Sequence, residues 1–192
     1  MRAASRRWPR AGDESAESTE PPPGDPEQDP GDPAAVARAI CLRLLTQRAR
    51  SRAELADALA RRGVPEDAAM AVLDRFTEVG LIDDAVLAET LAGAQHRERG
   101  LAGRAVAMKL RQRGLPEESV RAAVAGIDRD TERVRAQELV ERRLRALSGL
   151  PPEVQARRLV GLLARKGYPA GLAHEIVRST LAAAAGWEPG EP

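Results

Sequence analysis

The stretch Arg61-Arg62-Gly63-Val64-Pro65 recurs twice along the chain, as Gln112-Arg113-Gly114-Leu115-Pro116 and as Arg165-Lys166-Gly167-Tyr168-Pro169. Each copy contains a basic residue, Gly, one apolar residue and Pro, in that order. Gly can adopt the left-handed conformation that closes a helix, and Pro fits the first turn of a following helix, where no N–H is needed. The glycines lie 51 and 53 residues apart, which leaves room for about three helices per unit. The sequence therefore predicts an all-α fold of three tandem three-helix repeats that form an elongated curved array.

The composition of the chain is consistent with closely packed helices. Of 192 residues, 43% are apolar, but there are only one Phe, one Tyr and two Trp, so the core must be built from Ala, Leu, Val and Ile. A single cysteine excludes an internal disulfide and a cysteine-cluster metal site. No apolar run approaches the ~18 residues needed to cross a bilayer, and the N-terminus lacks the apolar segment of a secretory signal. We therefore expect a cytoplasmic protein.

Composition and charge also divide the chain. Residues 1–33 are rich in Pro and carry eight acidic and four basic side chains, which predicts a disordered acidic tail. The predicted repeats span residues 34–82, 83–128 and 129–185, and residues 186–192 should fray. Beyond the tail the net charge is +5, which is mildly basic and below what we expect of a protein held on DNA by charge alone.

Local signals agree from repeat to repeat. Ser51 and Glu54 are spaced as a capping box at the start of a helix. Nine and ten residues after the three glycines lie the apolar pairs Val72-Leu73, Ala123-Val124 and Ile176-Val177. Equivalent positions that share their residue type support a repeat, and no segment has the alternating pattern of a strand.

Few residues are suited to catalysis or to metal binding. His96 and His174 are the only histidines, and we predict that both face solvent, since neither has a partner at metal-ligand spacing. Cys41 lies beside an apolar stripe and is expected to be a packed thiol. Asp83 and Asp84 are expected to be helix caps. We therefore predict no catalytic residue, no metal and no cofactor.

Basic residues form the strongest candidate surface. They cluster in the second and third repeats, where equivalent helices should project them along one side of the array. The alternative is an ordinary solvated face, on which Glu138 and Glu141 pair with Arg142 and Arg145 four residues later. Aromatic residues that could stack on bases are missing. The predicted partner-binding residues are Arg97, Arg104, Lys109, Arg113, Arg142, Arg143 and Lys166.

The chain resembles the RecX family of bacterial recombination regulators. The resemblance is carried by Ser51-Arg52-Ala53-Glu54-Leu55, by Gly80-Leu81-Ile82-Asp83-Asp84 and by Leu163-Ala164-Arg165-Lys166-Gly167-Tyr168. It extends over about residues 34–183. One departure is Leu87-Ala88, where the family usually has an aromatic residue before the Ala.

This resemblance implies a protein without enzymatic activity that binds the RecA recombinase. RecX proteins lie in the groove of the RecA–DNA filament, where they slow ATP hydrolysis and strand exchange and limit coprotease activity. The expected partners are thus RecA and its filament, with at most a weak direct contact to DNA and none to membranes. We expect the chain to be a monomer.

Two other readings stay open at this point. Residues 51–82 also read as two helices followed by Gly-Leu-Ile, as in winged-helix DNA-binding regulators, although no β-branched segment follows to form a wing. A small hydrolase or nuclease would have to use Asp83, Asp84 and His96. Strands after Ile82 would support the first reading, and a pocket that gathers these three side chains would support the second.

Overall fold

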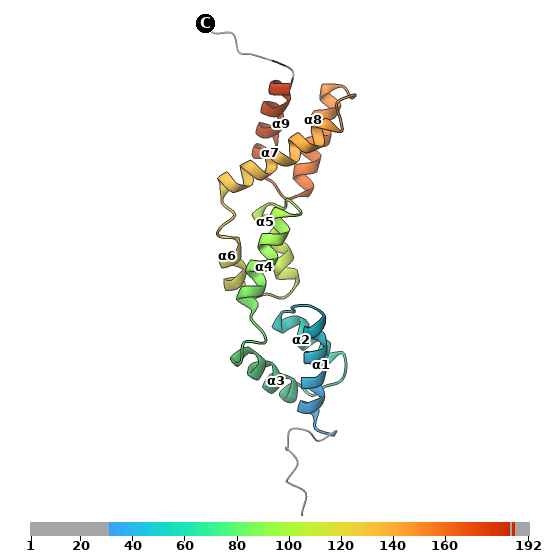
Figure 1. Cartoon of the computed structure of the whole chain (residues 1–192), viewed down its shortest axis with the longest axis vertical. Coiled ribbons are helices and arrows are strands. Elements are labelled where there is room, and N and C mark those ends of the chain that lie inside the picture. Colours follow the sequence, from blue (N-terminus) through green and yellow to red (C-terminus); the bar gives the residue numbers. More distant parts are fainter. Residues whose placement is uncertain (1–30, 185, 187–192) are drawn as a thin grey trace, which may run out of the picture.

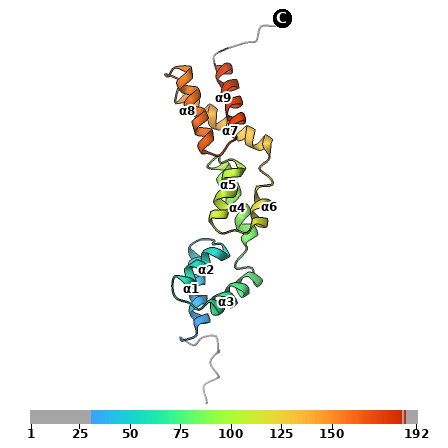
Figure 2. The same cartoon turned by 180° about the vertical axis from the view of Figure 1, so that it is seen from behind.

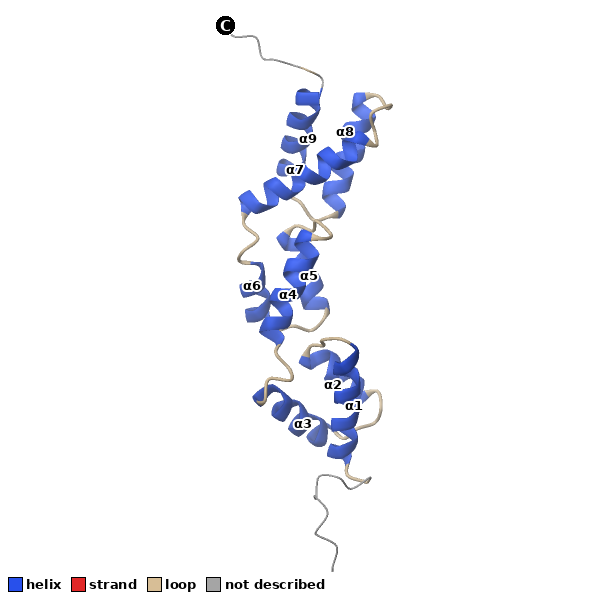
Figure 3. Ribbon diagram, viewed as in Figure 1, coloured by secondary structure: helices blue, strands red, loops and turns tan. Residues whose placement is uncertain are grey.

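The computed structural model describes residues 31–184 and 186. Within these residues the chain forms nine α-helices and no strand (Figure 3). The segment after Ile82 is therefore a helix and not a wing. The helices are α1 (Pro33–Gln47), α2 (Arg52–Ala60), α3 (Glu66–Glu78), α4 (Asp84–Arg97), α5 (Gly103–Gln112), α6 (Glu117–Val124), α7 (Arg129–Arg145), α8 (Pro152–Arg165) and α9 (Ala170–Ala184).

The helices form three repeats that follow one another along the long axis of an elongated molecule (Figure 1). Helices α1–α3, α4–α6 and α7–α9 pack closely within their own repeat, and the view from behind shows the same order (Figure 2). Each repeat surrounds its own cluster of buried apolar side chains. This arrangement confirms the predicted fold class.

Helix ends follow the local sequence signals. Ser51 and Glu54 form the predicted capping box at the start of α2, and the Asp83 carboxylate accepts hydrogen bonds from two backbone N–H groups at the start of α4. Helices α3 and α6 begin directly after Pro65 and Pro116. Side-chain caps such as those of Ser51 and Asp83 each stabilise a helix by about 0.5–2 kcal/mol.

The three glycines of the repeated stretch close their helices as predicted. Gly63, Gly114 and Gly167 have φ values of 73°, 70° and 89°. In each copy the residue after the glycine donates its backbone N–H to a carbonyl five residues earlier, for example Val64 N to Leu59 O at 3.2 Å. This pair of features defines the Schellman motif at a helix C-terminus.

Small apolar side chains fill the cores. In the first repeat Leu55, Leu59 and Leu73 are completely or almost completely buried, and each such side chain contributes roughly 1.5–3 kcal/mol. The predicted pairs Val72-Leu73 and Ile176-Val177 are buried, whereas Ala123 and Val124 are only partly covered.

The folded part begins slightly earlier than we predicted. Helix α1 starts at Pro33, and Asp32 caps it through hydrogen bonds from the Ala34 and Ala35 N–H groups at 2.9 and 3.2 Å. Of the predicted disordered tail, residues 1–30 lie outside the described part, and so do residues 187–192 of the segment 186–192 that we expect to fray. None of the described helices combines the length and apolar character required to span a membrane.

Candidate interaction surface

Two of the seven predicted partner-binding residues lie in joints between repeats. Arg113 ends α5 and packs against the first turn of α2 in the preceding repeat. The Ser51 hydroxyl donates to the Arg113 carbonyl at 2.6 Å, and the Arg113 guanidinium donates to both Glu54 carboxylate oxygens at 2.6 and 3.0 Å. Gly114 approaches so closely that an added Cβ would lie 2.5 Å from the Ala53 Cβ. A larger residue than glycine would therefore push the two repeats apart.

The joint between the second and third repeats is built in the same way. The Ala102 N–H donates to the Lys166 carbonyl at 3.0 Å, and a Cβ added to Gly167 would lie 2.6 Å from the Ala105 Cβ. The Lys166 ammonium donates to the Arg99 carbonyl. The two joints share one arrangement. The C-terminus of one middle helix, with its basic residue and glycine, contacts the N-terminus of the middle helix in the preceding repeat.

As a result, the middle helices meet end to end: the C-terminus of α8 contacts the N-terminus of α5, and the C-terminus of α5 contacts the N-terminus of α2. The C-terminus of a helix carries partial negative charge and the N-terminus partial positive charge, so this end-to-end stacking is electrostatically favourable. The Asp84 carboxylate adds to the first joint by accepting a hydrogen bond from the Arg52 N–H at 3.0 Å. The predicted caps are thus both present, with Asp84 capping a helix of the preceding repeat and not its own.

The first joint strongly stabilises one charged group. Burial alone would raise the pKa of Glu54, but hydrogen bonds from Arg113, Arg48 and the Ser51 N–H outweigh it and lower the pKa to about 2. The carboxylate therefore stays ionised and paired at any neutral or mildly acidic pH. Arg113 is half of this internal ion pair, so it is less available to a partner than its sequence position suggests.

The other five predicted residues, Arg97, Arg104, Lys109, Arg142 and Arg143, are exposed. Burial first, and then the positive charges of Arg142 and Arg135, lower the pKa of Lys166. Several basic side chains are therefore gathered where the third repeat meets the second, and of these Arg135 is paired with Glu138.

A separate group of arginines lies around one cleft of the third repeat. The cleft has a volume of about 520 Å³ and is lined by Arg143 from α7 and by Arg157, Arg158 and Arg165 from α8. No described acidic side chain forms an ion pair with any of these four arginines. Of the four, only Arg143 was among the predicted site residues, because sequence clustering does not show which helix faces meet.

Two glutamates of α7 interact with residues other than Arg142 and Arg145. Glu138 pairs with Arg135 at 2.5 Å, and Glu141 accepts a hydrogen bond from the Gln137 amide at 2.9 Å. The pairing of these two glutamates with Arg142 and Arg145, which an ordinary solvated face would show, is not formed.

Comparison with known proteins identifies the family of this array. The family models of the first, second and third three-helix domains of RecX match residues 37–76, 83–124 and 130–177. The chain belongs to the RecX family.

Relatives over most of the chain support this assignment. The regulatory protein RecX of Thermobifida fusca is 54% identical over 171 residues, which cover 89% of this chain and 92% of that protein. RecX of Mycolicibacterium smegmatis is 45% identical over 172 residues, which cover 88% and 92%. The crystal structure of RecX from Lactobacillus salivarius shares the fold, with a TM-score of 0.68 at 17% identity over 77% of this chain and 96% of that one.

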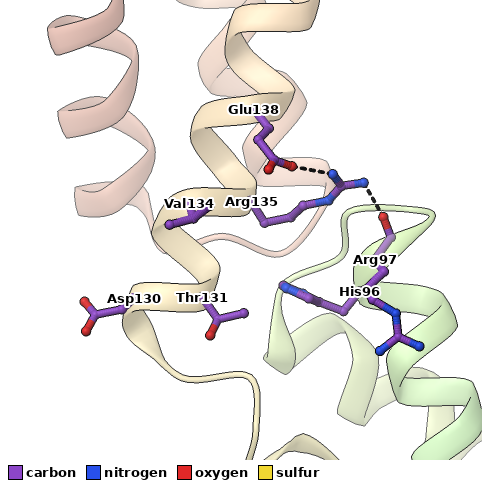
Figure 4. Close-up of a pocket in the computed structure, with 7 residues that line it drawn as sticks. All are labelled: His96, Arg97, Asp130, Thr131, Val134, Arg135 and Glu138. Carbon is purple, nitrogen blue, oxygen red and sulfur yellow. Dashed lines mark hydrogen bonds and ion pairs between the residues drawn. The ribbon is translucent and has the colours of Figure 1, made fainter.

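One prediction about this RecX chain was wrong. His96 is buried, not exposed to solvent, and its Nδ1 lies 2.8 Å from the Leu101 carbonyl. Because a carbonyl only accepts hydrogen bonds, Nδ1 carries the proton in this contact. His96 lies in the last turn of α4 and lines a pocket together with residues of α7 in the third repeat, where Arg135 links the Arg97 carbonyl to Glu138 (Figure 4). The neighbouring repeat covers His96, which its polar sequence neighbours did not indicate.

The other residues considered for catalysis or metal binding are Cys41, His174, Asp83 and Asp84. Cys41 is buried, and burial raises the pKa of its thiol, which disfavours the reactive thiolate. His174 is exposed as predicted. Asp83 and Asp84 bind backbone N–H groups, and neither lines the pocket beside His96. Within the described residues no group of three or more His, Cys, Asp or Glu side chains could hold a metal ion.

Proposed function

We propose that this RecX protein is a cytoplasmic negative regulator of the RecA recombinase. It would bind RecA and the RecA–DNA filament as a monomer and inhibit ATP hydrolysis, strand exchange and coprotease activity. The observation that carries this proposal is the presence of all three RecX domains, in order, in one elongated array.

The shape of the molecule supports this role. A row of repeats presents an extended surface, along which many modest contacts can add up to a useful affinity. Exposed ion pairs give only about 0–1 kcal/mol each, so binding would depend on several of them at once. The unpaired arginines of the second and third repeats supply such contacts for an acidic protein surface or for phosphate groups.

A titration of RecA ATPase activity tests the proposal. We expect inhibition at amounts below one chain per RecA subunit, together with loss of strand exchange. Unchanged ATPase and strand-exchange activity across the whole titration would contradict it. Tight binding to one DNA sequence in the absence of RecA would instead favour a transcriptional regulator.

Charge reversal tests the predicted surface. A triple variant of exposed residues that form no internal ion pair should weaken inhibition at least tenfold while leaving helicity and unfolding unchanged, because it replaces attraction with repulsion. The matched control reverses three exposed arginines elsewhere and changes the net charge equally. If both variants inhibit equally, the contact surface lies elsewhere. The test variant is Arg97→Glu, Arg104→Glu, Arg142→Glu, and the control is Arg43→Glu, Arg121→Glu, Arg178→Glu.

A further inference from the structure

The element that forms both internal joints occurs a third time, and there it has no partner among the described residues. In each joint the docking element is a basic residue followed by a glycine at the end of a middle helix, and the third copy is Arg62-Gly63 at the end of α2. Within residues 31–184 no repeat lies before the first one, so this copy has no neighbouring repeat to contact in the described array. All residues from Arg61 to Gly63 are exposed.

The free copy has the same backbone geometry as the two docked copies. Gly63 has a φ of 73°, against 70° and 89° for Gly114 and Gly167. The Gly63 N–H donates to the Ala60 carbonyl at 3.0 Å, and the equivalent bonds of the other two glycines measure 2.8 and 3.0 Å. The docking conformation is thus formed before any partner arrives, which lowers the entropic cost of binding.

The groups that make contact in the joints are unused in the free copy. The carbonyls of Arg113 and Lys166 accept hydrogen bonds from the preceding repeat, whereas that of Arg62 accepts none from any described residue. A Cβ added to Gly63 would meet no atom within 4 Å. The Arg62 guanidinium turns back onto the Ala58 carbonyl of its own helix at 2.9 Å.

The two internal joints indicate what this element binds, and the first is the closer match because its basic residue is also an arginine. In both, the occupant is the N-terminus of a helix with a free donor at its first capping position and an alanine in its first turn. In the first joint a glutamate in that turn pairs with the basic residue. The partial positive charge of a helix N-terminus complements the partial negative charge at the end of α2.

A second copy of this chain does not offer such a site. The N-termini of α2 and α5 are already occupied, and the equivalent cap of α8 is Pro151, followed by Pro152. Proline has no N–H and no hydroxyl, so it cannot donate to the Arg62 carbonyl. The N-terminus of α8 therefore prevents head-to-tail association between two copies of the chain.

We propose that Arg62-Gly63 is a docking site for the N-terminus of an exposed helix in a different protein, one capped by Ser or Thr with Ala and Glu in its first turn. The inference goes beyond the proposed function, because it assigns a binding site that the proposed function does not use. It can also be tested on the chain alone, in the absence of RecA.

The test gives the chain a helix N-terminus that Arg62-Gly63 can bind. Replacing residues 151–154 (Pro-Pro-Glu-Val) with Ser-Arg-Ala-Glu, the sequence of residues 51–54, gives α8 the N-terminus that α2 has. The full chain with this graft should self-associate head to tail in sedimentation equilibrium, while the unmodified chain stays monomeric. No rise in mass up to about 1 mM, where even weak joints associate measurably, would overturn the proposal.

Two further variants show that any association uses Arg62-Gly63. Adding Arg62→Glu to the graft should abolish the rise in mass, because it opposes the grafted glutamate at position 154. Changing that position to lysine in the same chain should restore the association. Association that persists with Arg62→Glu would show a different contact and would contradict the proposal.

A milder variant covers the case in which the graft disturbs α8. Pro151→Ser with Glu153→Ala supplies only the cap and the alanine of the first turn, and Ser is a favoured helix cap, so the fold should be retained. Urea unfolding checks this, and a rise in mass is expected at higher concentration than with the full graft, because the ion pair with Arg62 is missing. A folded chain with these two changes that stays monomeric up to about 1 mM would also overturn the proposal.

Discussion

At the scale of single residues, glycine determines how closely the repeats can approach. Gly63 and Gly114 share the same left-handed conformation, but only Gly114 touches another repeat. The two positions therefore separate the cost of backbone strain from the cost of a steric clash.

We predict that Gly63→Ala lowers the free energy of unfolding by about 1–2 kcal/mol through strain alone. Gly114→Ala should lower it by roughly a further 1–3 kcal/mol, because the new methyl group overlaps the Ala53 Cβ at 2.5 Å. Urea unfolding of both variants measures the difference. Equal losses would mean that the second repeat can shift without cost.

Glu54 should make stability depend on acid pH. Its folded pKa of about 2 lies below the ordinary value of 4.5, so its contribution is fully present above pH 4.5 and is lost as the pH falls towards 2. After allowance for solvent screening of this partly exposed group, the contribution is on the order of 1–2 kcal/mol. In Glu54→Gln this part of the pH dependence should disappear from unfolding curves recorded between pH 2 and 6.

A matched control for this experiment is Glu89→Gln. Glu89 is exposed and has no ion-pair partner among the described residues. A chain with this change should retain the acid dependence of the original protein. If both variants keep it, the pair of Glu54 with Arg113 is not its source.

The structural positions of some residues could be predicted from their sequence neighbours, and those of other residues could not. The capping box of Ser51 and Glu54 and the turns at the glycines depend on a few neighbouring residues, and both were predicted correctly. His96 was predicted wrongly, and the inward position of Arg113 was missed, because both depend on a neighbouring repeat. The repeat itself held the missing signal, since Arg113 and Lys166 occupy equivalent positions before a glycine.

At the scale of helices, a glycine in the middle of α8 affects both the stability of the helix and the shape of the arginine cleft. Gly161 lies in the middle of this helix and lines the arginine cleft. Glycine inside a helix costs about 0.5–1 kcal/mol relative to alanine. Its small size keeps the cleft open between Arg157 and Arg165, one turn away on either side.

We predict that Gly161→Ala raises the free energy of unfolding by about 0.5–1 kcal/mol, because the new methyl group meets only the mobile end of Arg165 at 3.4 Å. The matched change Gly93→Ala in α4 should gain less, since three guanidinium atoms of Arg97 lie 2.6–2.9 Å from its new Cβ. Thermal or urea unfolding compares the two. A loss of stability in Gly161→Ala would show that the helix is more tightly packed than this contact indicates.

At the scale of the whole molecule, each repeat has its own core, and among the described residues only Ala102 of the second repeat packs into the core of the third. A compact protein of the same described length would have a radius of gyration of about 15 Å. The row of repeats should give a clearly larger value in small-angle X-ray scattering of a chain that begins at residue 31. A value near that of a compact protein would mean that the repeats fold back on one another in solution.

The overall architecture was accessible from the sequence because a repeated helix-closing stretch marks each unit, and the RecX relatives confirm that division into three domains. The cleft of Arg143, Arg157, Arg158 and Arg165 was not, since it requires knowing how α7 crosses α8. Internal repetition predicts which units exist. It does not predict which side chains converge between them.

The joint used at both boundaries also has an evolutionary consequence. Because each unit carries the docking residues at one end and the receiving helix at the other, duplicating the middle unit would lengthen the protein without any newly invented interface. Length in such a protein becomes a variable that selection, or a protein engineer, can adjust in whole steps, up to the proline pair that closes the series.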